Sequence, residues 1–425
     1  MTRGKSGYSP LRVAFIGAGR TGGAGIAMGR IEEAVRSVAQ GSIVIDVFTQ
    51  DSLPPVTRFR VFFFKYFHRI RSRLLFRPGN SYLHSVAKVR TGLAKIINQN
   101  DYDLVHLHWI GDGLISIEEI GEIRHPIIWT LHDMWVLGGA EHVTASTRYA
   151  DSYEENSRGA FEKGPDINRE TFLRKKHAWQ SLELRIVTPS TWLSEAAKKS
   201  EICSRAQIRV IQNPVSLDKS EEIKRRQLRR SWELSEDEII LSFGTDKGGW
   251  DENKGVQDLG LILHHVREDL SQRGDGRRVR LLTFGPNYRK LAKLNPDCIQ
   301  LGKIKEYHKI KEVLSLSDFV LVPSRIDNFP NIALESLSAG TPVAGYSHSG
   351  VGEIVSDGLD GVLAPPFEPA LLARKVARAL ASPEMMRRLQ LSGQKKASNL
   401  WSYEKIGRQY ISEYTDILES RAKKD

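Results

Sequence analysis

The stretch "VPSRIDNFPNIALESLSAGTPVAGY", residues 322–346, carries the signals of one complete strand–helix–strand unit. An apolar run gives way to a polar loop that contains Asp327. Pro330 suits the first position of a helix, where its missing N–H costs nothing. Gly340, followed two residues later by a proline, ends that helix. "TPVAGY" then has the composition of the next buried strand, so the stretch predicts one repeat of a parallel α/β sheet.

The same alternation runs through both halves of the 425-residue chain, which is too long for one ordinary core. Buried strands are expected at "RVAFIG", "SIVIDVF", "DLVHLHW", "PIIWTLH" and "LRIVTPS" in the first half, and at "IILSFG", "VRLLTFG", "CIQLG" and "DFVLVPS" in the second. We predict an α/β protein with two Rossmann-like, doubly wound domains facing a cleft. The predicted parts are a domain over 1–214, a linker over 215–237, a domain over 238–398, and a C-terminal helix over 399–425 that packs back on the first domain.

Composition restricts the class of protein and of partner. Hydrophobic residues make up 40% of the chain and charged residues 27%, which is typical of a soluble globular protein. No apolar run approaches the ~20 residues of a membrane span, and "MTRGKSGYSP" lacks the apolar core of a signal peptide. Cys203 and Cys298 are too far apart for a metal-binding spacing, so we expect a cytoplasmic protein. The net charge of +11 calls for nucleic acid, anionic lipid or a phosphorylated small molecule.

The informative residues should lie just after the strands, because open parallel sheets bind ligands at the carboxyl ends of their strands. The helix that begins near Pro330 would turn its N–H groups and its dipole to that side, which suits a phosphate. Glu335 lies about one turn into the helix, and seven residues separate it from Asp327. An isolated pair of acids usually belongs to a capped helix with a solvated acid. Here strand, loop, acid, Pro-Asn, acid, Gly and Pro follow in one order.

That order resembles the E-x7-E region of the retaining family 4 glycosyltransferases of GT-B fold, with aspartate at the first acidic position. The resemblance covers nearly the whole chain and is closest to polysaccharide-assembly members of the colanic-acid type, whose N-terminal halves read like "VHLHW … WTLHDMW". It implies that Glu335 holds the ribose hydroxyls of a nucleoside-diphosphate sugar and that Asp327 contacts hydroxyls of the transferred sugar. It also implies a backbone segment that faces the sugar and the diphosphate, formed by Phe329, Pro330, Asn331 and Ile332.

Histidines follow two of the first-half strands. In "TLHDMWVLGGAEH", His132 and Asp133 stand at the ligand end of a strand, where a lone histidine is more often a packing residue. The resemblance implies instead that His132 lies against the transferred sugar and the scissile bond. In "HLHW", His106 and His108 point to one face of a strand, which favours structural support, with His108 or Trp109 near the acceptor as the alternative. The relatives often have a cysteine-rich loop after the HDMW element, and its absence here argues against a metal or disulfide in that loop.

A lysine follows the first strand of the second domain in "SFGTDKGGWDENKGVQDL". In the family, a basic residue just after this strand and a Lys-Gly pair grip the diphosphate. Lys254 and Gly255 match the second element, although a surface lysine at a helix start has the same appearance. Gly244 is followed by threonine and aspartate rather than arginine, so either Lys247 substitutes or the loop carries an insertion.

The N-terminal "RVAFIGAGRTGGAG" fits the G-x-G-x-x-G dinucleotide fingerprint at Gly17, Gly19 and Gly22. Asp46 on the next strand supplies the acid that a ribose would want. An NAD-binding Rossmann oxidoreductase is therefore an alternative, but it leaves the second Rossmann half and its acids unexplained. The resemblance implies that Gly22 and Gly23 belong to a glycine loop that faces the cleft on the acceptor side.

Residues 56–80, "VTRFRVFFFKYFHRIRSRLLFRPGN", contain seven Lys and Arg residues and no acid. Read as a helix, they form an apolar stripe of Phe63, Phe67, Ile70 and Leu74. The opposite side holds Lys65, Arg69 and Arg73. This is either an ordinary amphipathic helix on the core or a helix that lies on anionic lipid; no nucleic-acid-binding module accompanies the charge.

The predicted function is metal-independent transfer of a sugar from a nucleoside-diphosphate sugar to a saccharide or lipid-linked acceptor, with retention, in polysaccharide biosynthesis. His132, Asp327 and Lys254 are the predicted catalytic residues, without a resident cofactor or a nucleic-acid partner. Lys254 and the helix N-terminus near Asn331 are aimed where the leaving diphosphate gathers charge. The alternatives are the NAD-binding oxidoreductase and a GT-B-fold nucleotide-sugar epimerase. The enzyme would be cytoplasmic, and peripheral on the inner face of the cytoplasmic membrane if the 56–80 helix binds lipid.

Overall fold

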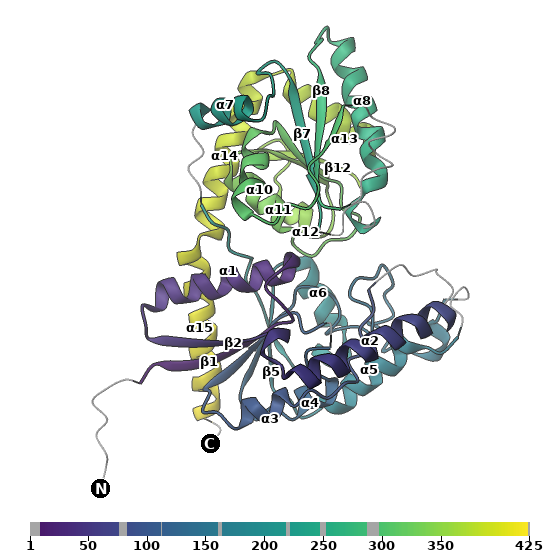
Figure 1. Cartoon of the computed structure of the whole chain (residues 1–425), viewed down its shortest axis with the longest axis vertical. Coiled ribbons are helices and arrows are strands. Elements are labelled where there is room, and N and C mark those ends of the chain that lie inside the picture. The colour runs from purple at the N-terminus through teal and green to yellow at the C-terminus, as the bar shows by residue number, and fades with distance from the viewer. Residues whose placement is uncertain are drawn as a thin grey trace. The chain divides into compact units, whose positions relative to one another are not determined.

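The computed structural model describes residues 9–75, 83–111, 113–159, 164–217, 222–246, 252–286 and 297–423. Within α2, the side chains of residues 65 and 67–75 are outside this description. The chain forms two compact units (Figure 1). Unit 1 comprises Met1–Gln212 with Tyr403–Asp425, and unit 2 comprises Asn213–Ser402.

Unit 1 is built on a six-stranded parallel sheet with the order β2-β1-β3-β4-β5-β6. Its strands are β1 (Leu11–Ile16), β2 (Ile43–Phe48), β3 (Leu104–Leu107), β4 (Ile127–Thr130), β5 (Leu184–Thr188) and β6 (Gln207–Val210). Its helices are α1 (Gly22–Ala39), α2 (Pro55–Leu75), α3 (Leu93–Asn98), α4 (Ile117–Gly121), α5 (Ile167–Ala178), α6 (Thr191–Lys199) and α15 (Tyr403–Ala422). The strand order reverses between β1 and β3, and such a switch point is where open α/β sheets bind ligands.

The C-terminal helix α15 packs beside α1 and closes one face of the unit 1 sheet (Figure 1). Its buried side chains Ile406, Tyr410 and Tyr414 join Val35 of α1 and the strand residues in one apolar cluster. The helical spacing of these residues in the sequence therefore corresponds to the face that covers the sheet.

Unit 2 repeats the architecture with a second six-stranded parallel sheet, in the order β12-β11-β10-β7-β8-β9. Its strands are β7 (Ile239–Gly244), β8 (Val279–Phe284), β9 (Cys298–Gln300), β10 (Phe319–Val322), β11 (Val343–Tyr346) and β12 (Gly361–Ala364). Its helices are α7 (Glu222–Ser231), α8 (Leu259–Gln272), α10 (Tyr307–Leu316), α11 (Asn331–Ser338), α12 (Ser349–Ile354), α13 (Pro369–Leu380) and α14 (Pro383–Trp401). The strand order here reverses between β7 and β10.

The two parallel sheets confirm the predicted α/β class, but the boundaries between the parts differ from the predicted ones. The stretch 215–237, predicted as a linker, contains α7 and belongs to unit 2. Arg225 and Arg229 of α7 hold the buried Asp318 carboxylate at 2.5 and 2.8 Å, which ties the helix to the unit 2 sheet. The charged composition of this stretch thus reflects buried ion pairs as well as solvent exposure. Among the described helices, none has the length and apolar character that a membrane crossing requires.

Candidate active site

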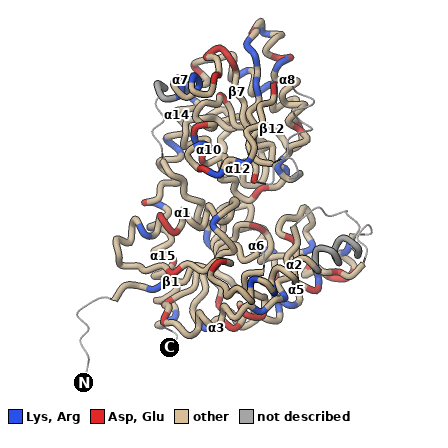
Figure 2. Tube along the Cα trace, in the orientation of Figure 1, with Lys and Arg blue, Asp and Glu red and all other residues tan. Residues whose placement is uncertain are grey.

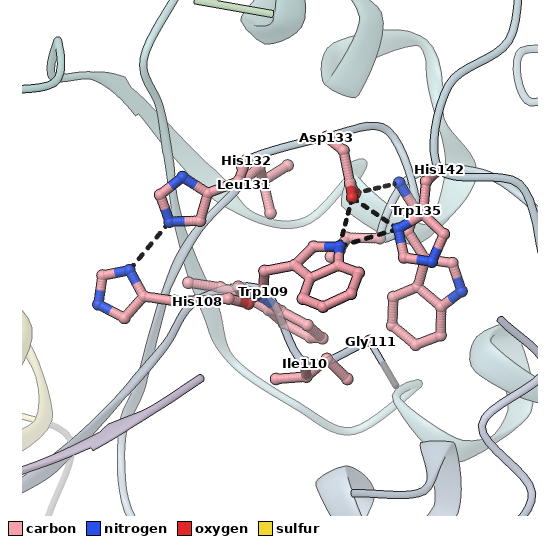
Figure 3. A pocket seen from close by; sticks show the side chains of 11 residues that line it. His108, Trp109, Ile110, Gly111, Leu131, His132, Asp133, Trp135 and His142 are labelled. Atoms are coloured by element: carbon pink, nitrogen blue, oxygen red, sulfur yellow. Dashed lines mark hydrogen bonds and ion pairs between the residues drawn. The ribbon is translucent and has the colours of Figure 1, made fainter. Parts of the chain in front are cut away.

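In unit 1, the predicted histidine lies at the carboxyl edge of the sheet beside a second histidine. β3 pairs with β4, so the residues that follow the two strands come together. The Nδ1 atom of His108 lies 3.1 Å from Nε2 of His132, and the two rings stack (Figure 3). Burial lowers the pKa of His132 to about 4 and that of His108 well below its usual value. Both imidazoles are therefore neutral at pH 7, and one ring N–H donates to the other ring.

Asp133 points to the other side of the same loop (Figure 3). Its Oδ2 accepts from Trp109 Nε1 at 2.7 Å and from His142 Nδ1 at 2.6 Å, and its Oδ1 accepts from the Trp135 backbone N–H at 2.9 Å. Burial alone would raise the pKa of Asp133, but His142 and the two N–H donors lower it. Because both oxygens are engaged, Asp133 acts as an anchor of the loop rather than as a free base.

His142 and Ser85 complete this network and were not found from the sequence. His142 donates from Nδ1 to Asp133, and its Nε2 lies 2.7 Å from Ser85 Oγ. Ser85 lies 48 residues before Asp133 in the chain, which no local pattern reveals. His142 ends the same "HDMWVLGGAEH" segment, and its spacing from Asp133 was the one available signal.

His106 has the structural role that its position in the strand favoured. The side chain is fully buried, with Nδ1 2.8 Å from the Tyr414 hydroxyl and Nε2 2.8 Å from Thr130 Oγ1. It therefore joins β3 and β4 to α15. His108 and Trp109, by contrast, line the small pocket that His132 and Asp133 also line (Figure 3).

The glycine loop reaches the same edge of the unit 1 sheet. The N–H of Ala18 donates to the Trp109 carbonyl at 2.7 Å, which brings the loop beside the residues that follow β3. Gly22 begins α1 with a φ of +72°, and Gly23 follows it in the first turn. Asp46 does not lie at this edge: its carboxylate is held by Arg12 and by the Tyr102 hydroxyl, two residues before β2 ends. The dinucleotide interpretation therefore lacks its ribose-binding acid.

In unit 2, the structure brings Lys254 and Asp327 together as an ion pair. Asp327 lies in the loop between β10 and α11, and Lys254 ends the short 3-10 turn Glu252–Lys254. Gly255, at a φ of +73°, makes this approach possible, because a Cβ there would lie 1.9 Å from the Pro323 carbonyl oxygen. The two residues predicted to contact the sugar and the diphosphate are thus neighbours, although 73 positions separate them in the sequence.

The predicted donor-binding segment leads into α11. The helix begins at Asn331, one residue later than predicted. Pro330 precedes it with an extended ψ of 115°. Glu335 is buried on this helix. Phe329 packs edge-on against Trp401 in the core, so only its backbone faces the loop side. Asn331 accepts from Asn213 Nδ2 at 3.1 Å.

The remaining predicted donor-binding residues are Ile332, Gly244 and Lys247. Ile332 is half-buried against the same core as Phe329. Gly244 ends β7, and Lys247 lies outside the described residues, so its predicted contact with the diphosphate stays a prediction.

A loop that sequence reasoning missed supports Asp327 from the next strand. After β11, the Gly350 N–H donates to the Asp327 carbonyl at 2.9 Å, and Ser349 Oγ accepts from the Asp327 N–H at 3.3 Å. A Cβ at Gly350 would lie 1.8 Å from the Asn328 carbonyl oxygen. The glycines of "HSGVG" directly after a strand were the available signal, of the same kind as the N-terminal glycine loop.

Two sequence families match the two units. The model described as Glycosyltransferase Family 4 matches residues 31–219, and the model described as Glycosyl transferases group 1 matches residues 225–396. Alpha-D-kanosaminyltransferase of Streptomyces kanamyceticus is 25% identical over 205 residues, 47% of this chain and 51% of that protein. WcaL of Salmonella typhimurium, a glycosyltransferase named for colanic acid biosynthesis, is 30% identical over 137 residues, 30% of this chain and 33% of that protein. The chain thus spans about half or less of the length of these relatives.

Solved structures share the two-unit fold over nearly the whole chain. Anabaena HepE in complex with UDP and glucose superposes with a TM-score of 0.63 at 15% identity, covering 96% of this chain and 100% of that one. WaaG, a glycosyltransferase involved in lipopolysaccharide biosynthesis, superposes with a TM-score of 0.58 at 15% identity, covering 93% and 98%. Identities this low establish the GT-B fold and nothing further.

Proposed function

Since the chain belongs to the family 4 glycosyltransferases of GT-B fold, we propose that it transfers a sugar from a nucleoside-diphosphate sugar to a saccharide or lipid-linked saccharide, with retention. The observation that carries the proposal is the Lys254–Asp327 ion pair at the carboxyl edge of the unit 2 sheet, with Glu335 buried on the helix that follows. An acceptor of sugar hydroxyls and an acceptor of ribose hydroxyls then lie along one loop and its helix, and a cation from the turn after β7 pairs with the first of them.

Each unit 2 residue has a distinct role in this proposal. As the bond from the sugar to the diphosphate breaks, negative charge gathers on the leaving oxygen, and Lys254 stabilises that charge. Asp327 gives up the lysine and accepts hydrogen bonds from the transferred sugar. Glu335 and the backbone from Phe329 to Ile332 hold the nucleotide side of the donor. Retention is an implication of the family, and the direct and the double-displacement routes both remain open.

Unit 1 supplies uncharged polar groups to the same reaction. His132 is neutral at pH 7, because burial lowers its pKa to about 4. We propose that it hydrogen-bonds the transferred sugar as a neutral imidazole, while Asp133 holds its loop. Gly22 and Gly23 would let the acceptor approach the backbone closely. No cofactor or metal ion has a role in this proposal.

Donor binding tests the proposal before any acceptor is known. UDP-, GDP- and ADP-sugars are compared by thermal unfolding, and a donor at 100 times its Kd should stabilise the fold by about 2.7 kcal/mol. Product analysis with simple saccharides then gives the anomeric configuration. Consumption of the donor without an acceptor would favour the epimerase, and stabilisation by NAD alone would favour the oxidoreductase. Indifference to every nucleotide sugar would refute the proposal.

We also propose that α2 of this enzyme rests on an anionic membrane surface. The described part of the helix exposes an apolar row in which Phe59 and Phe62 are 63% and 64% exposed, and the ring centroids of Phe59 and Phe63 lie 4.6 Å apart. Exposed aromatic rows of this kind mark contact surfaces. Among the described side chains of α2, that of Val61 is buried in unit 1.

The positive charge of the helix favours anionic lipid as the binding partner of this apolar row. The stretch 56–80 has seven basic residues and no acid, and each Lys or Arg near an anionic surface contributes about 1 kcal/mol. Elsewhere, Lys and Arg are intermixed with Asp and Glu along both units (Figure 2), so the net charge by itself does not mark a nucleic-acid surface. The predicted stripe of Phe67, Ile70 and Leu74, and the predicted basic side of Lys65, Arg69 and Arg73, lie outside the described side chains.

Co-sedimentation with phosphatidylglycerol vesicles at low and high salt tests this proposal. Wild-type protein should bind at low salt, and Phe59→Ser with Phe62→Ser should weaken binding without changing donor affinity. Leu359→Ser is the matched control, because Leu359 is an exposed apolar residue of unit 2. Wild-type protein that ignores these vesicles at low salt, or a double variant that binds like the control, would make a soluble acceptor the better proposal.

A further inference from the structure

Lys175 on α5 is a fully buried lysine for which the proposed reaction has no use. Its ammonium donates to three backbone carbonyl oxygens of one loop, those of Trp135, Gly138 at 3.1 Å and Gly139 at 2.6 Å. The Nζ atom also lies 3.7 Å from the centroid of the Trp135 ring, within the range of a cation–π interaction. Lysine is almost never fully buried unless it is paired in this way.

The geometry explains why this position holds a lysine. Three acceptors converge on one atom, and an ammonium is the side-chain group with three donors on a single atom. An arginine would spread its donors over a planar fork, and an amide would offer two. Burial lowers the pKa of Lys175 well below its usual value, against the carboxylates of Glu141 and Asp133, which raise it. The three carbonyl oxygens and the face of the Trp135 ring also favour the charged ammonium of Lys175, as these carboxylates do.

The loop that Lys175 holds is the one that carries the unit 1 site. Trp135 offers its carbonyl to Lys175 and its N–H to Asp133, so one residue links the lysine to the anchor beside His132. The Trp135 ring stacks on His142, the other partner of Asp133. The loop also lies directly on α5, because a Cβ at Gly139 would be 2.6 Å from the Asn168 Cα.

We propose that Lys175 is a positioning residue, whose buried ammonium fixes the carbonyls of Trp135, Gly138 and Gly139 and thereby sets the place of His132 at the site of sugar transfer. The effect of Lys175 on catalysis rests on the proposed function, whereas its effect on the loop does not. Lys175 touches neither donor nor acceptor, and it acts through the backbone of the loop.

Lys175→Met and Lys175→Gln test this role against Val35→Ala. Val35 is a fully buried residue of α1 in the apolar cluster with α15, so its truncation destabilises unit 1 without touching the loop. Among folded molecules, kcat should fall roughly 10²-fold in Lys175→Met and less in Lys175→Gln, as expected for a displaced reacting group. The KM for the donor should stay within about threefold, because the proposed donor residues belong to unit 2. Amide exchange over residues 134–142 should accelerate in both lysine variants and not in Val35→Ala.

The outcomes separate the two proposals. Equal losses of kcat and of loop protection in Lys175→Met and Val35→Ala would overturn the positioning role. If the wild-type protein transfers no sugar, the proposed function fails, and amide exchange alone decides whether Lys175 holds the loop. If neither lysine variant folds, 15N-lysine NMR of the unaltered protein decides. One slowly exchanging NH3+ group at pH 7 would support the proposal, and a neutral amine would refute it.

Discussion

The two sheets place their sites in the same way and equip them differently. In each unit the candidate residues follow strands at or beside the point where the strand order reverses. At the unit 1 edge they form a hydrogen-bonded network around His132 and Asp133, in which the imidazole next to the pocket is neutral. At the unit 2 edge they form an ion pair between Lys254 and Asp327, whose side chains are 31% and 11% exposed.

This difference indicates what each edge contributes to the proposed reaction. A network whose side chains already hydrogen-bond to one another changes little when a ligand arrives, and it provides fixed geometry. A partly exposed ion pair can exchange its partners, and it provides charge where a diphosphate leaves. We therefore expect charge substitutions to have their largest effects in unit 2 and geometric substitutions in unit 1.

Removal of the unit 2 cation should have the largest effect. Lys254→Ala should lower kcat by roughly 10²–10³, as does the loss of other groups that stabilise a developing anion. Lys303→Ala is the control, because Lys303 is an exposed unit 2 lysine that pairs with Asp246 at 3.4 Å. Initial-rate kinetics on both variants is the measurement. If Lys254→Ala were as fast as the control, Lys254 would not bind the diphosphate. Another cation would then have that role, and Lys247 would be the first to test.

Two histidines near the same edge of the unit 1 sheet, His106 and His132, should behave in opposite ways. His132→Ala should fold normally and lose roughly 10² in kcat, because the group beside the sugar is gone. His106→Ala should lose about 1–3 kcal/mol of stability, because the buried Tyr414 hydroxyl loses this partner, while its folded fraction keeps its turnover. Paired melting and kinetic measurements check both outcomes. If His132→Ala lost activity only in proportion to its unfolded fraction, His132 would have a structural role like that of His106.

Glu335→Gln should have a smaller effect that is confined to donor binding. A charge-assisted hydrogen bond contributes about 1.5–3 kcal/mol, so donor affinity should fall roughly 10- to 10²-fold. Glu353→Gln, on the neighbouring helix α12, is a control that also removes one carboxylate. Isothermal titration with the identified nucleotide sugar makes the comparison. Equal affinities for the wild type and Glu335→Gln would remove Glu335 from the donor site.

Sequence patterns predicted the described strands other than β6 and β12, and the residues that follow them, because both depend on local composition. The β10–α11 segment shows this: its acid, its helix and its terminating Gly340 lie where the pattern puts them, and the helix start differs by one residue. Contacts between distant segments were beyond the sequence. Nothing local pairs Ser85 with His142, or the lysine of α5 with the carbonyls after Trp135. The charged stretch around Arg229 was misassigned as a linker for the same reason, since its partner Asp318 is 89 residues away.

Acid should distinguish the units by stability. Burial lowers the pKa of His106, His108 and His132 in unit 1, the last to about 4, from an ordinary value near 6.5. Between pH 6.5 and 4 the unfolded chain therefore binds protons that the folded unit does not, so the stability of unit 1 falls as the pH falls. Buried carboxylates such as Asp318 of unit 2 have a lowered pKa, so their contribution is lost at still lower pH.

Hydrogen exchange of core amides, corrected for intrinsic rates, should thus accelerate in unit 1 before unit 2 when the pH drops from 7 to 5. His106→Asn removes one titrating group from the same buried site, so it should lower overall stability yet flatten this pH dependence. Equal acid sensitivity of β3 and β10 amides would contradict the assignment of neutral buried imidazoles to unit 1. If exchange in unit 1 accelerated more than in unit 2 and His106→Asn did not change this difference, the proton responsible would bind to the His108–His132 pair. That pair is the part of the network nearest the proposed chemistry.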